Sequence, residues 1–485
     1  MRELNCDVVV VGCGAAGLTA ALAALQNGAK VILLERSTVD DRGGNTRWTE
    51  ALLRMTPDGE PTRNFIQRFT DQAGYHITPE FVQATAANYE SWPALVKALP
   101  FTDPELLATF VDGIPKVLEW LRPHGIRTHP SMYPLPPALP TRLPSIYGGG
   151  LAIIEALCPE IERLGAQIEY ETTAVRLLTD DDERVVGIKA TDRNHAGVMI
   201  KARGVVLACG GFEGNPEMTV RYMGPEARYL RPVARGGWYN RGEGIRMALE
   251  VNAAPAGDYA ECHRQPIDPR SNRAESLVFA YPLGVLVNAQ GQRFIDEAPN
   301  HVAGYLEEPL RALSRQPGGI AYFIFDQQIE HTPNWRIMVR SDQPAIEAPS
   351  LRELATKIGI SPDTLEATIT DFNRVCPSGP WDTSKFDRQC TNALLPAKSN
   401  WARPITEPPF GCFPIIAANN FTFGGLKVSP KAEVINASGV PVPGLYAAGE
   451  TVGIFYGDYI GATSVLRALV FGLQAGTHAA QAARD

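Results

Sequence analysis

An α/β fold that begins with a βαβ dinucleotide-binding unit is the fold class that the sequence predicts. Residues 7–11 are a β-branched run typical of a buried parallel strand, and the glycine-rich segment 12–17 follows at once. An alanine- and leucine-rich helix then runs to about Asn27 and leads to a second strand at residues 31–34, which is followed by Glu35. Strand, glycines, helix, strand and acid in this order predict a Rossmann-like domain.

Each glycine of this unit has a physical reason to be there. Gly12 lets the chain turn sharply, and Gly14 removes a side chain where a pyrophosphate approaches. Gly17 lets helix and strand pack closely, and the helix N-terminus favours negative charge. Glu35, at the end of the second strand, is placed to bond ribose hydroxyls. The sequence therefore predicts a bound dinucleotide.

Four later segments favour FAD over NAD as that dinucleotide. Residues 43–46, Gly-Gly-Asn-Thr, follow the βαβ unit, and residues 207–211 and 444–450 are strands running into glycines. Residues 461–464 begin a helix whose positive end can stabilise an anionic reduced flavin. The residues that we expect to contact FAD are Gly12, Gly14, Ala16, Gly17, Glu35, Arg36, Gly43, Gly44, Asn45, Thr46, Ala174, Ala208, Gly210, Gly211, Gly242, Glu243, Glu450, Ser464, Val465 and Leu466.

The domain organisation follows from length and from changes of pattern along the chain. A chain of 485 residues exceeds one ordinary core, so two or more domains are expected. Residues 1–257 and 422–485 are predicted to form a single FAD-binding domain. Residues 258–421 change to strands, proline turns and short amphipathic helices, and are predicted to form an inserted α+β capping domain that contacts the substrate.

Composition narrows the possible partners and the compartment. A net charge of −8 argues against nucleic-acid binding. No apolar run is long enough to span a membrane, and the eight cysteines form no CxxC spacing, so no metal, haem or iron–sulfur cluster is expected. Scattered cysteines suit a reducing cytoplasm, which is the predicted location.

The chain resembles the flavoprotein family of fumarate reductase and succinate dehydrogenase. The residues that carry this resemblance are 12–17, 43–46, 242–248, 293–297, 424–425 and 443–450. Within the family it is most similar to tricarballylate dehydrogenases, through residues 43–50, 396–404 and 421–428. The resemblance implies an FAD domain interrupted by a capping domain, with the substrate between the cap and the flavin.

The chain departs from that family at several functional positions. The segment that carries a flavin-tethering histidine in many members reads Thr46-Arg47-Trp48 here, which predicts noncovalent FAD. The positions of the family's proton-donating arginine, a histidine and a second arginine correspond to His301, Phe421 and Tyr459. Only the early histidine of the cap, His263, remains, so fumarate reduction itself is not expected.

Candidate catalytic residues follow from the chemistry of C–C bond oxidation beside a carboxylate, which needs cations, a base and flavin N5. Arg47 is the first choice for holding a carboxylate through its planar fork. His263, His301 and Tyr459 are the candidates for acid–base work.

The leading function is an FAD-dependent dehydrogenase that oxidises a C–C bond of a small, tricarballylate-like polycarboxylate. The alternative is a flavin-dependent dehydrogenase or reductase of a ring ketone or enone, like the 3-ketosteroid dehydrogenases. A third class is a noncatalytic flavin-binding or electron-transfer subunit. No second dinucleotide motif is present, so the expected electron acceptor is a separate redox protein, a quinone-linked partner or oxygen.

Overall fold

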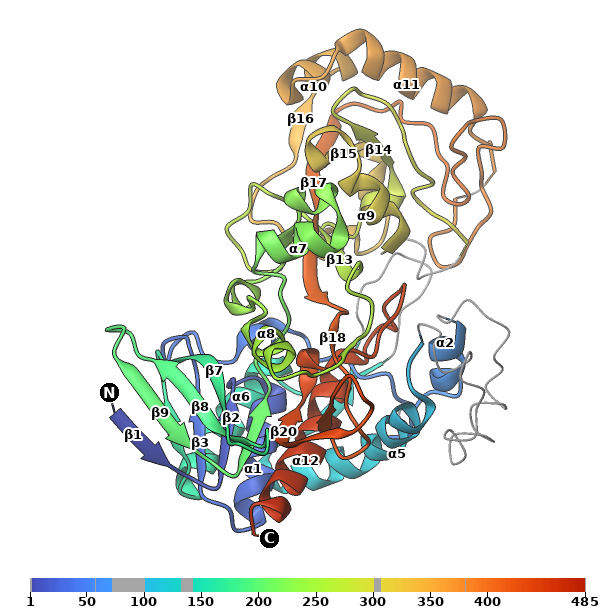
Figure 1. The fold of residues 1–485 in the computed structure, drawn as a ribbon. Coiled ribbons are helices and arrows are strands. Elements are labelled where there is room, and N and C mark those ends of the chain that lie inside the picture. The colour runs from blue at the N-terminus through green and yellow to red at the C-terminus, as the bar shows by residue number, and fades with distance from the viewer. Residues whose placement is uncertain are drawn as a thin grey trace.

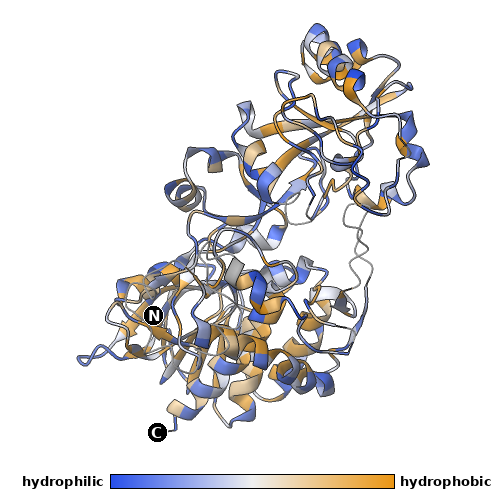
Figure 2. Ribbon diagram, turned by 90° about the vertical axis from the view of Figure 1, so that its right-hand side faces the viewer, coloured by the Kyte–Doolittle hydropathy of each residue, from blue (hydrophilic) through white to orange (hydrophobic). Residues whose placement is uncertain are grey.

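The protein folds into two lobes, with both chain ends in the lower lobe (Figure 1). The structure is a computed structural model that describes residues 2–56, 58–71, 101–131, 143–300, 307–379 and 381–484. The lobes have separate hydrophobic cores: one is built from the first and last parts of the chain, and the others from the segments between them. Figure 2 shows the apolar residues running through the strands and helices of both lobes.

The lower lobe is centred on a six-stranded sheet in the order β19-β20-β10-β2-β3-β6. Its strands are β2 (Val8–Val11), β3 (Val31–Leu34), β6 (Gln167–Glu169), β10 (Gly204–Leu207), β19 (Glu433–Ile435) and β20 (Pro441–Ala447). All neighbours pair in parallel except β19 with β20. No residue of β2 is more than 6% exposed, which confirms the predicted buried parallel strand and explains its unbroken run of valines.

Helices cover this sheet, and the first and last of them pack on each other. They are α1 (Ala15–Gln26), α5 (Pro104–Leu121), α6 (Gly149–Arg163), α8 (Glu243–Glu250) and α12 (Ser464–Ala482). A Cβ on Gly476 of α12 would lie 2.0 Å from the carbonyl oxygen of Ala20 in α1, so glycine is required for this close approach. The chain's outer segments thus share one core.

A four-stranded sheet lies at one side of the lower lobe, in the order β1-β9-β8-β7. Its strands are β1 (Arg2–Asn5), β7 (Thr173–Thr179), β8 (Val185–Thr191) and β9 (Gly197–Lys201). Smaller elements are α2 (Phe65–Asp71), β4 (Thr128–Pro130), β5 (Pro144–Ile146) and α7 (Pro216–Met223).

The upper lobe is a second six-stranded sheet organised around the long strand β17 (Phe410–Thr422). Its other strands are β11 (Arg231–Pro232), β13 (Cys262–Ile267), β14 (Val285–Asn288), β15 (Ile320–Asp326) and β16 (Ile346–Ala348). Phe323 and Ile324 of β15 enter different cores, since successive side chains of a strand face opposite sides. The second of these cores lies under α10 (Leu351–Ile358) and α11 (Pro362–Val375), and α9 (Glu307–Ser314) contributes to the first.

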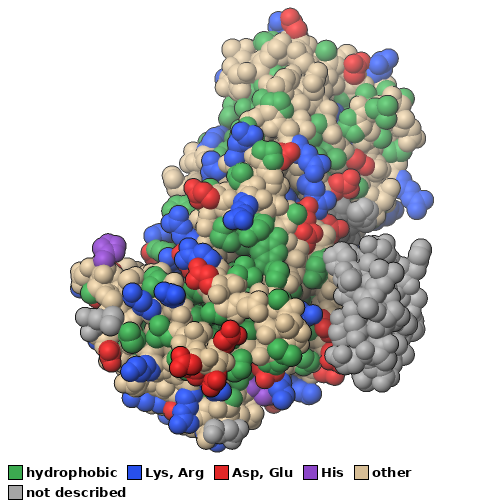
Figure 3. Space-filling view, in the orientation of Figure 1, with side chains coloured by type: hydrophobic (Ala, Val, Ile, Leu, Met, Phe, Trp, Pro, Cys, Tyr) green, Lys and Arg blue, Asp and Glu red, His purple; other side chains and the backbone are tan. Residues whose placement is uncertain are grey.

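The chain passes between the lobes near a short antiparallel pair, β12 (Pro255–Ala256) with β18 (Gly425–Leu426). The boundaries predicted at residues 257/258 and 421/422 lie beside this pair and stay predictions. Within the described residues no helix combines the length and the hydropathy that a bilayer crossing requires. On the face seen in Figure 3, acidic and basic side chains are interspersed.

Candidate active site

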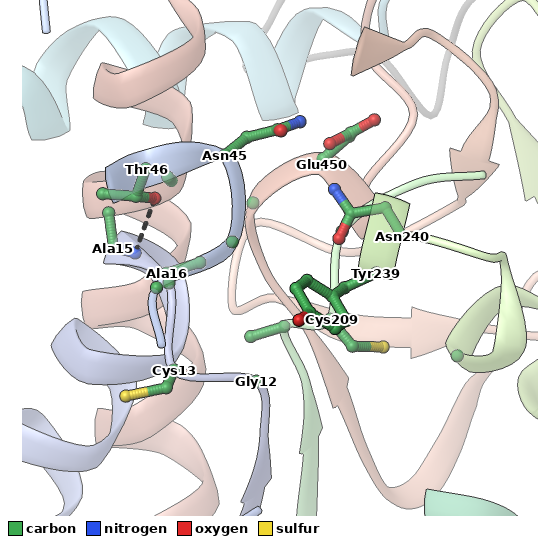
Figure 4. Close-up of a pocket in the computed structure, with 18 of the residues that line it drawn as sticks. Gly12, Cys13, Ala15, Ala16, Asn45, Thr46, Cys209, Tyr239, Asn240 and Glu450 are labelled. Atoms are coloured by element: carbon green, nitrogen blue, oxygen red, sulfur yellow. Dashed lines mark hydrogen bonds between the residues drawn. The ribbon is translucent and has the colours of Figure 1, made fainter. Parts of the chain in front are cut away.

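A large cavity opens at the carboxyl ends of the parallel strands, which is where open α/β sheets bind ligands. It contains about 1280 Å³ of atom-free space, part of it continuous with solvent. Many of the predicted contact residues line it, namely Gly12, Gly14, Ala16, Glu35, Arg36, Gly43, Gly44, Asn45, Thr46, Ala174, Ala208, Gly210, Glu243, Glu450, Ser464 and Val465. Figure 4 shows several of these side chains converging from separate segments.

The N-terminus of α1 forms one wall of the cavity. Its cap residue is Gly14, no side chain caps it, and its first turn holds no acid. The N–H of Ala15 donates to Thr46 Oγ1 at 3.0 Å, which fastens the 3₁₀ turn Gly44–Trp48 against the helix (Figure 4). A Cβ on Gly14 would lie 3.3 Å from that hydroxyl, so a larger residue would fill the wall. This open helix end suits a pyrophosphate.

Two glycines of the motif are required by the backbone, one for its conformation and the other for close packing. Gly12 has a φ of +107°, a left-handed conformation that favours glycine. A Cβ on Gly17 would lie only 1.8 Å from the carbonyl oxygen of Gly12, so Gly17 lets strand and helix approach without itself lining the cavity. Gly211, Gly242 and Leu466 also lie behind the cavity wall, and a Cβ on Gly211 would reach Glu450 Oε1 at 2.2 Å.

Glu35 lies buried in the cavity wall after β3. Its Oε2 accepts a hydrogen bond from the N–H of Cys13 at 3.0 Å, and its Oε1 accepts one from Ser37 at 2.8 Å. Each oxygen retains a lone pair for a ribose hydroxyl. Arg36 donates to the carbonyl oxygen of Tyr239 at 2.6 Å and pairs with Glu243 at 3.0 Å, which ties this strand end to α8.

A second carboxyl group, which the sequence analysis missed, lies beside Glu450. The amide nitrogens of Asn45 and Asn240 donate to Glu213 Oε1 at 2.7 and 2.6 Å. Glu450 Oε1 accepts hydrogen bonds from the backbone N–H of Thr422, at 2.8 Å, and from its hydroxyl. Burial and the Glu450 carboxylate raise the pKa of Glu213 well above its ordinary value, and burial also raises the pKa of Glu450. We infer that the neighbouring carboxyls hold a proton, because ionising both would place two like charges in a buried site.

The first turn of α12 marks the end of the cavity toward the upper lobe. The hydroxyl oxygen of Tyr459 accepts hydrogen bonds from the N–H groups of Thr463 and Ser464, both at 3.0 Å. Ser464 and its neighbour Val465 line the cavity. Tyr459 therefore sits on the start of this helix, adjacent to the cavity lining.

The structure brings His263 and Tyr459 together, although they are far apart in the sequence. Their ring centroids are 4.5 Å apart, and Phe421, which lines the cavity, is 4.9 Å from Tyr459. His263 is 5% exposed, and its Nδ1 lies 2.5 Å from Glu307 Oε1 of α9. Among the described residues none hydrogen-bonds to its Nε2, which leaves that atom for a ligand.

Two predicted catalytic residues do not join this cluster. Arg47 does not line the cavity, and its guanidinium carbon lies 6.0 Å from the ring centroid of Trp48. Thr46, Trp48 and Thr49 reach the cavity from this turn instead. His301 lies outside the described residues.

Sequence reasoning also missed Asn240, Glu213 and Arg467. The first two follow no recognisable motif, and they reach the site only through tertiary packing. Arg467 is the fourth residue of α12, lines the cavity and is 1% exposed. Burial lowers its pKa to about 10. The signal that could have revealed Arg467 is its position in the sequence, one turn into the helix that begins after Gly461.

The fold and the cavity define an FAD-binding flavoprotein, because the glycine wall, the open end of α1 and the size of the cavity fit that dinucleotide. The FAD binding domain family matches residues 7–465, and the chain belongs to this family. It is an FAD-dependent oxidoreductase that acts on CH–CH bonds.

The chain is similar to proteins with different activities. Vinyl phenol reductase of Lactiplantibacillus plantarum is 27% identical over 98% of this chain and 96% of its own length. The open conformation of a flavocytochrome c3 fumarate reductase has a TM-score of 0.76 and 25% identity, over 100% of this chain and 79% of that one. The 3-ketosteroid-Δ4-(5α)-dehydrogenase of Rhodococcus jostii has a TM-score of 0.65 and 25% identity, over 99% of this chain and 98% of that one.

Proposed function

We propose that the protein transfers a hydride between FAD and a C–C bond of a small carboxylate, with tricarballylate-like polycarboxylates as the leading class. The observation that carries the proposal is the cluster of His263, Phe421 and Tyr459 at the α12 end of the FAD cavity. A substrate in contact with this cluster lies beside the flavin end of the cavity.

The chain's own residues then have separate tasks. FAD, when bound, supplies the hydride acceptor or donor. Glu307 holds Nδ1 of His263, which fixes the ring and presents Nε2 for exchange of a proton or for a hydrogen bond with a carboxylate. The cavity-lining Phe421 supplies an apolar wall that limits water around the reacting carbons.

The hydroxyl of Tyr459 favours a second candidate, a ring ketone or enone. Its oxygen is fixed by two backbone N–H groups, and its proton can go to Ser464 Oγ, 3.1 Å away, or to a substrate carbonyl. Arg47, the cation that the sequence predicts for a carboxylate, does not line the cavity, which weakens the case for a carboxylate substrate. The similar 3-ketosteroid dehydrogenase supports this candidate.

Anaerobic bleaching of the flavin absorbance separates the two candidates. The FAD-loaded protein is mixed with tricarballylate or with a 3-ketosteroid, and the wild type is compared with Tyr459→Phe. We expect tricarballylate or a related polycarboxylate to bleach the flavin, with a modest loss in Tyr459→Phe. Bleaching by the steroid alone, abolished in Tyr459→Phe, would support the second candidate, and bleaching by neither class would contradict the proposal.

We further propose that FAD is bound noncovalently and that its electrons pass to a separate redox protein, a quinone-linked partner or oxygen. The turn that follows Gly43 carries Thr46, Arg47 and Trp48, and none of these has the imidazole used for tethering. Acid denaturation should therefore release the yellow cofactor into the supernatant. Flavin that remains with the precipitated chain would contradict noncovalent binding.

A further inference from the structure

Arg54 is anchored to the loop that precedes α12. Its backbone N–H donates to the carbonyl oxygen of Ala462 at 2.8 Å, and its Nε donates to that of Gly461 at 2.7 Å. Among the described residues its two terminal guanidinium nitrogens form no hydrogen bond. The guanidinium is therefore fixed by one edge at the start of α12, and the outer edge of its fork is free.

Arg68 lies on α2, which packs near the same place. Phe69 of α2 stacks on Phe455 with ring centroids 5.9 Å apart, and Phe455 lies 5.3 Å from Tyr459. The stack places α2, which carries Arg68, beside the segment that holds Tyr459 and leads into α12. Burial, together with the charge of Arg68, lowers the pKa of Arg54.

Within the part of the chain that the structure describes, neither arginine has an acidic partner. Arg264 and Arg311, by contrast, both pair with Glu261, at 2.5 and 3.0 Å. The start of α12 adds further positive potential beside Arg54, because the N–H dipoles of a helix point outward at its N-terminus. Like charges gathered at one half-buried place repel each other, and a bound anion would relieve that repulsion.

We propose that Arg54 and Arg68 bind a carboxylate group of the substrate at the start of α12. The inference rests on the proposed function and deepens it, since it assigns to these arginines the task that sequence reasoning gave to Arg47. A planar guanidinium fork suits a carboxylate, and Arg54 is hydrogen-bonded to Gly461, two residues beyond Tyr459, whose ring contacts His263. Neither arginine lines the FAD cavity itself, so a substrate held there by one carboxylate would extend from the start of α12 toward the cavity.

Malonate provides a direct test because it carries two carboxylates and lacks the adjacent saturated carbons that a dehydrogenase oxidises. The FAD-loaded protein is titrated with malonate, and binding is followed by the change in flavin absorbance and by the thermal unfolding midpoint. We expect saturable binding, weakened about tenfold or more in Arg54→Ala and by a smaller factor in Arg68→Ala. Arg54→Lys should restore part of the affinity, since a point charge cannot reproduce the fork.

The matched control is Arg63→Ala, which removes an exposed arginine just before α2 and should bind malonate as the wild type does. FAD content is measured in every variant, and Arg68→Ala keeps the test valid if Arg54→Ala loses FAD. Equal malonate affinity in wild type, Arg54→Ala and Arg68→Ala, or no binding in the wild type, would overturn the assignment. If malonate binds through these arginines while no carboxylate bleaches the flavin, the anion site stands and the proposed function fails.

Discussion

The two ends of the cavity are built in different ways. The dinucleotide end is made mostly of backbone: Gly12, Gly14 and Gly17 act by having no side chain, and the N-terminus of α1 supplies donors. The opposite end is made of side chains, with His263 and Tyr459 meeting from different lobes and segments. Backbone sites depend on local sequence spacing, whereas side-chain clusters depend on how distant segments pack.

The two ends also differ in charge. Near Glu450 the second carboxyl, Glu213, is buried, and burial together with the Glu450 carboxylate raises its pKa. Beside Tyr459, Arg54 and Arg68 have no described acidic partner. The buried carboxyl Glu450 thus lines one part of the cavity, whereas the positive charge of the two arginines lies outside the cavity lining, at the start of α12.

The largest effect is expected at the backbone end. Gly14→Glu should reduce FAD content to below about a tenth of wild type, because its Cβ would crowd Thr46 and its carboxylate would repel the pyrophosphate. FAD released from purified protein is measured by absorbance. Gly439→Asn is the control, because that glycine is in open space with φ +83°, which asparagine tolerates. Wild-type FAD content in Gly14→Glu would place the pyrophosphate elsewhere.

At the side-chain end, His263→Ala should leave FAD content unchanged and lower the rate of flavin reduction by substrate about 10²- to 10⁴-fold. Glu307→Gln should give a smaller loss, because it keeps the side chain's size but removes the charge that holds Nδ1. Stopped-flow absorbance under anaerobic conditions measures both. An unchanged rate in His263→Ala would exclude the histidine from the reaction.

The carboxyl pair predicts a pH dependence of stability. Because the pKa of Glu213 is raised in the folded state, the protonated carboxyl contributes fully to the free energy of unfolding below the ordinary glutamate pKa of 4.5. This contribution is lost as pH rises through the folded pKa of Glu213. Glu213→Gln cannot lose a proton, so its stability advantage over the wild type should grow with pH above 4.5. The thermal unfolding midpoint of the FAD-loaded protein, followed from acid to alkaline pH, should differ by about a few degrees. Parallel curves for the two proteins would refute a shared proton.

The smallest effect is expected at Arg47, which the sequence ranked first among the cations. Because its side chain neither lines the cavity nor, among the described contacts, bonds to the start of α12, Arg47→Ala should change the KM for substrate less than about threefold, within the range of ordinary surface substitutions. Steady-state kinetics with FAD content checked gives the answer. A loss of substrate affinity comparable with that in Arg54→Ala would restore the original assignment.

The sequence by itself predicted the βαβ unit, the buried strands and the FAD site. These features are local: Gly12, Gly14 and Gly17 are spaced by the geometry of one strand–helix turn, and Glu35 follows from the length of the next strand. Family resemblance added His263, which the structure places against Tyr459. Contact with FAD or substrate at each individual residue stays a prediction.

The packing of distant segments determines which cation is anchored at the start of α12 and which carboxyl lies beside Glu450. Arg47 and Arg54 lie on the same segment, yet only Arg54 is fastened to the start of α12, because that contact depends on a loop more than four hundred residues away. Glu213 meets Glu450 through the approach of two strand ends that no sequence spacing encodes. Side-chain direction in a loop is set by its packing partners, and those partners come from distant parts of the chain.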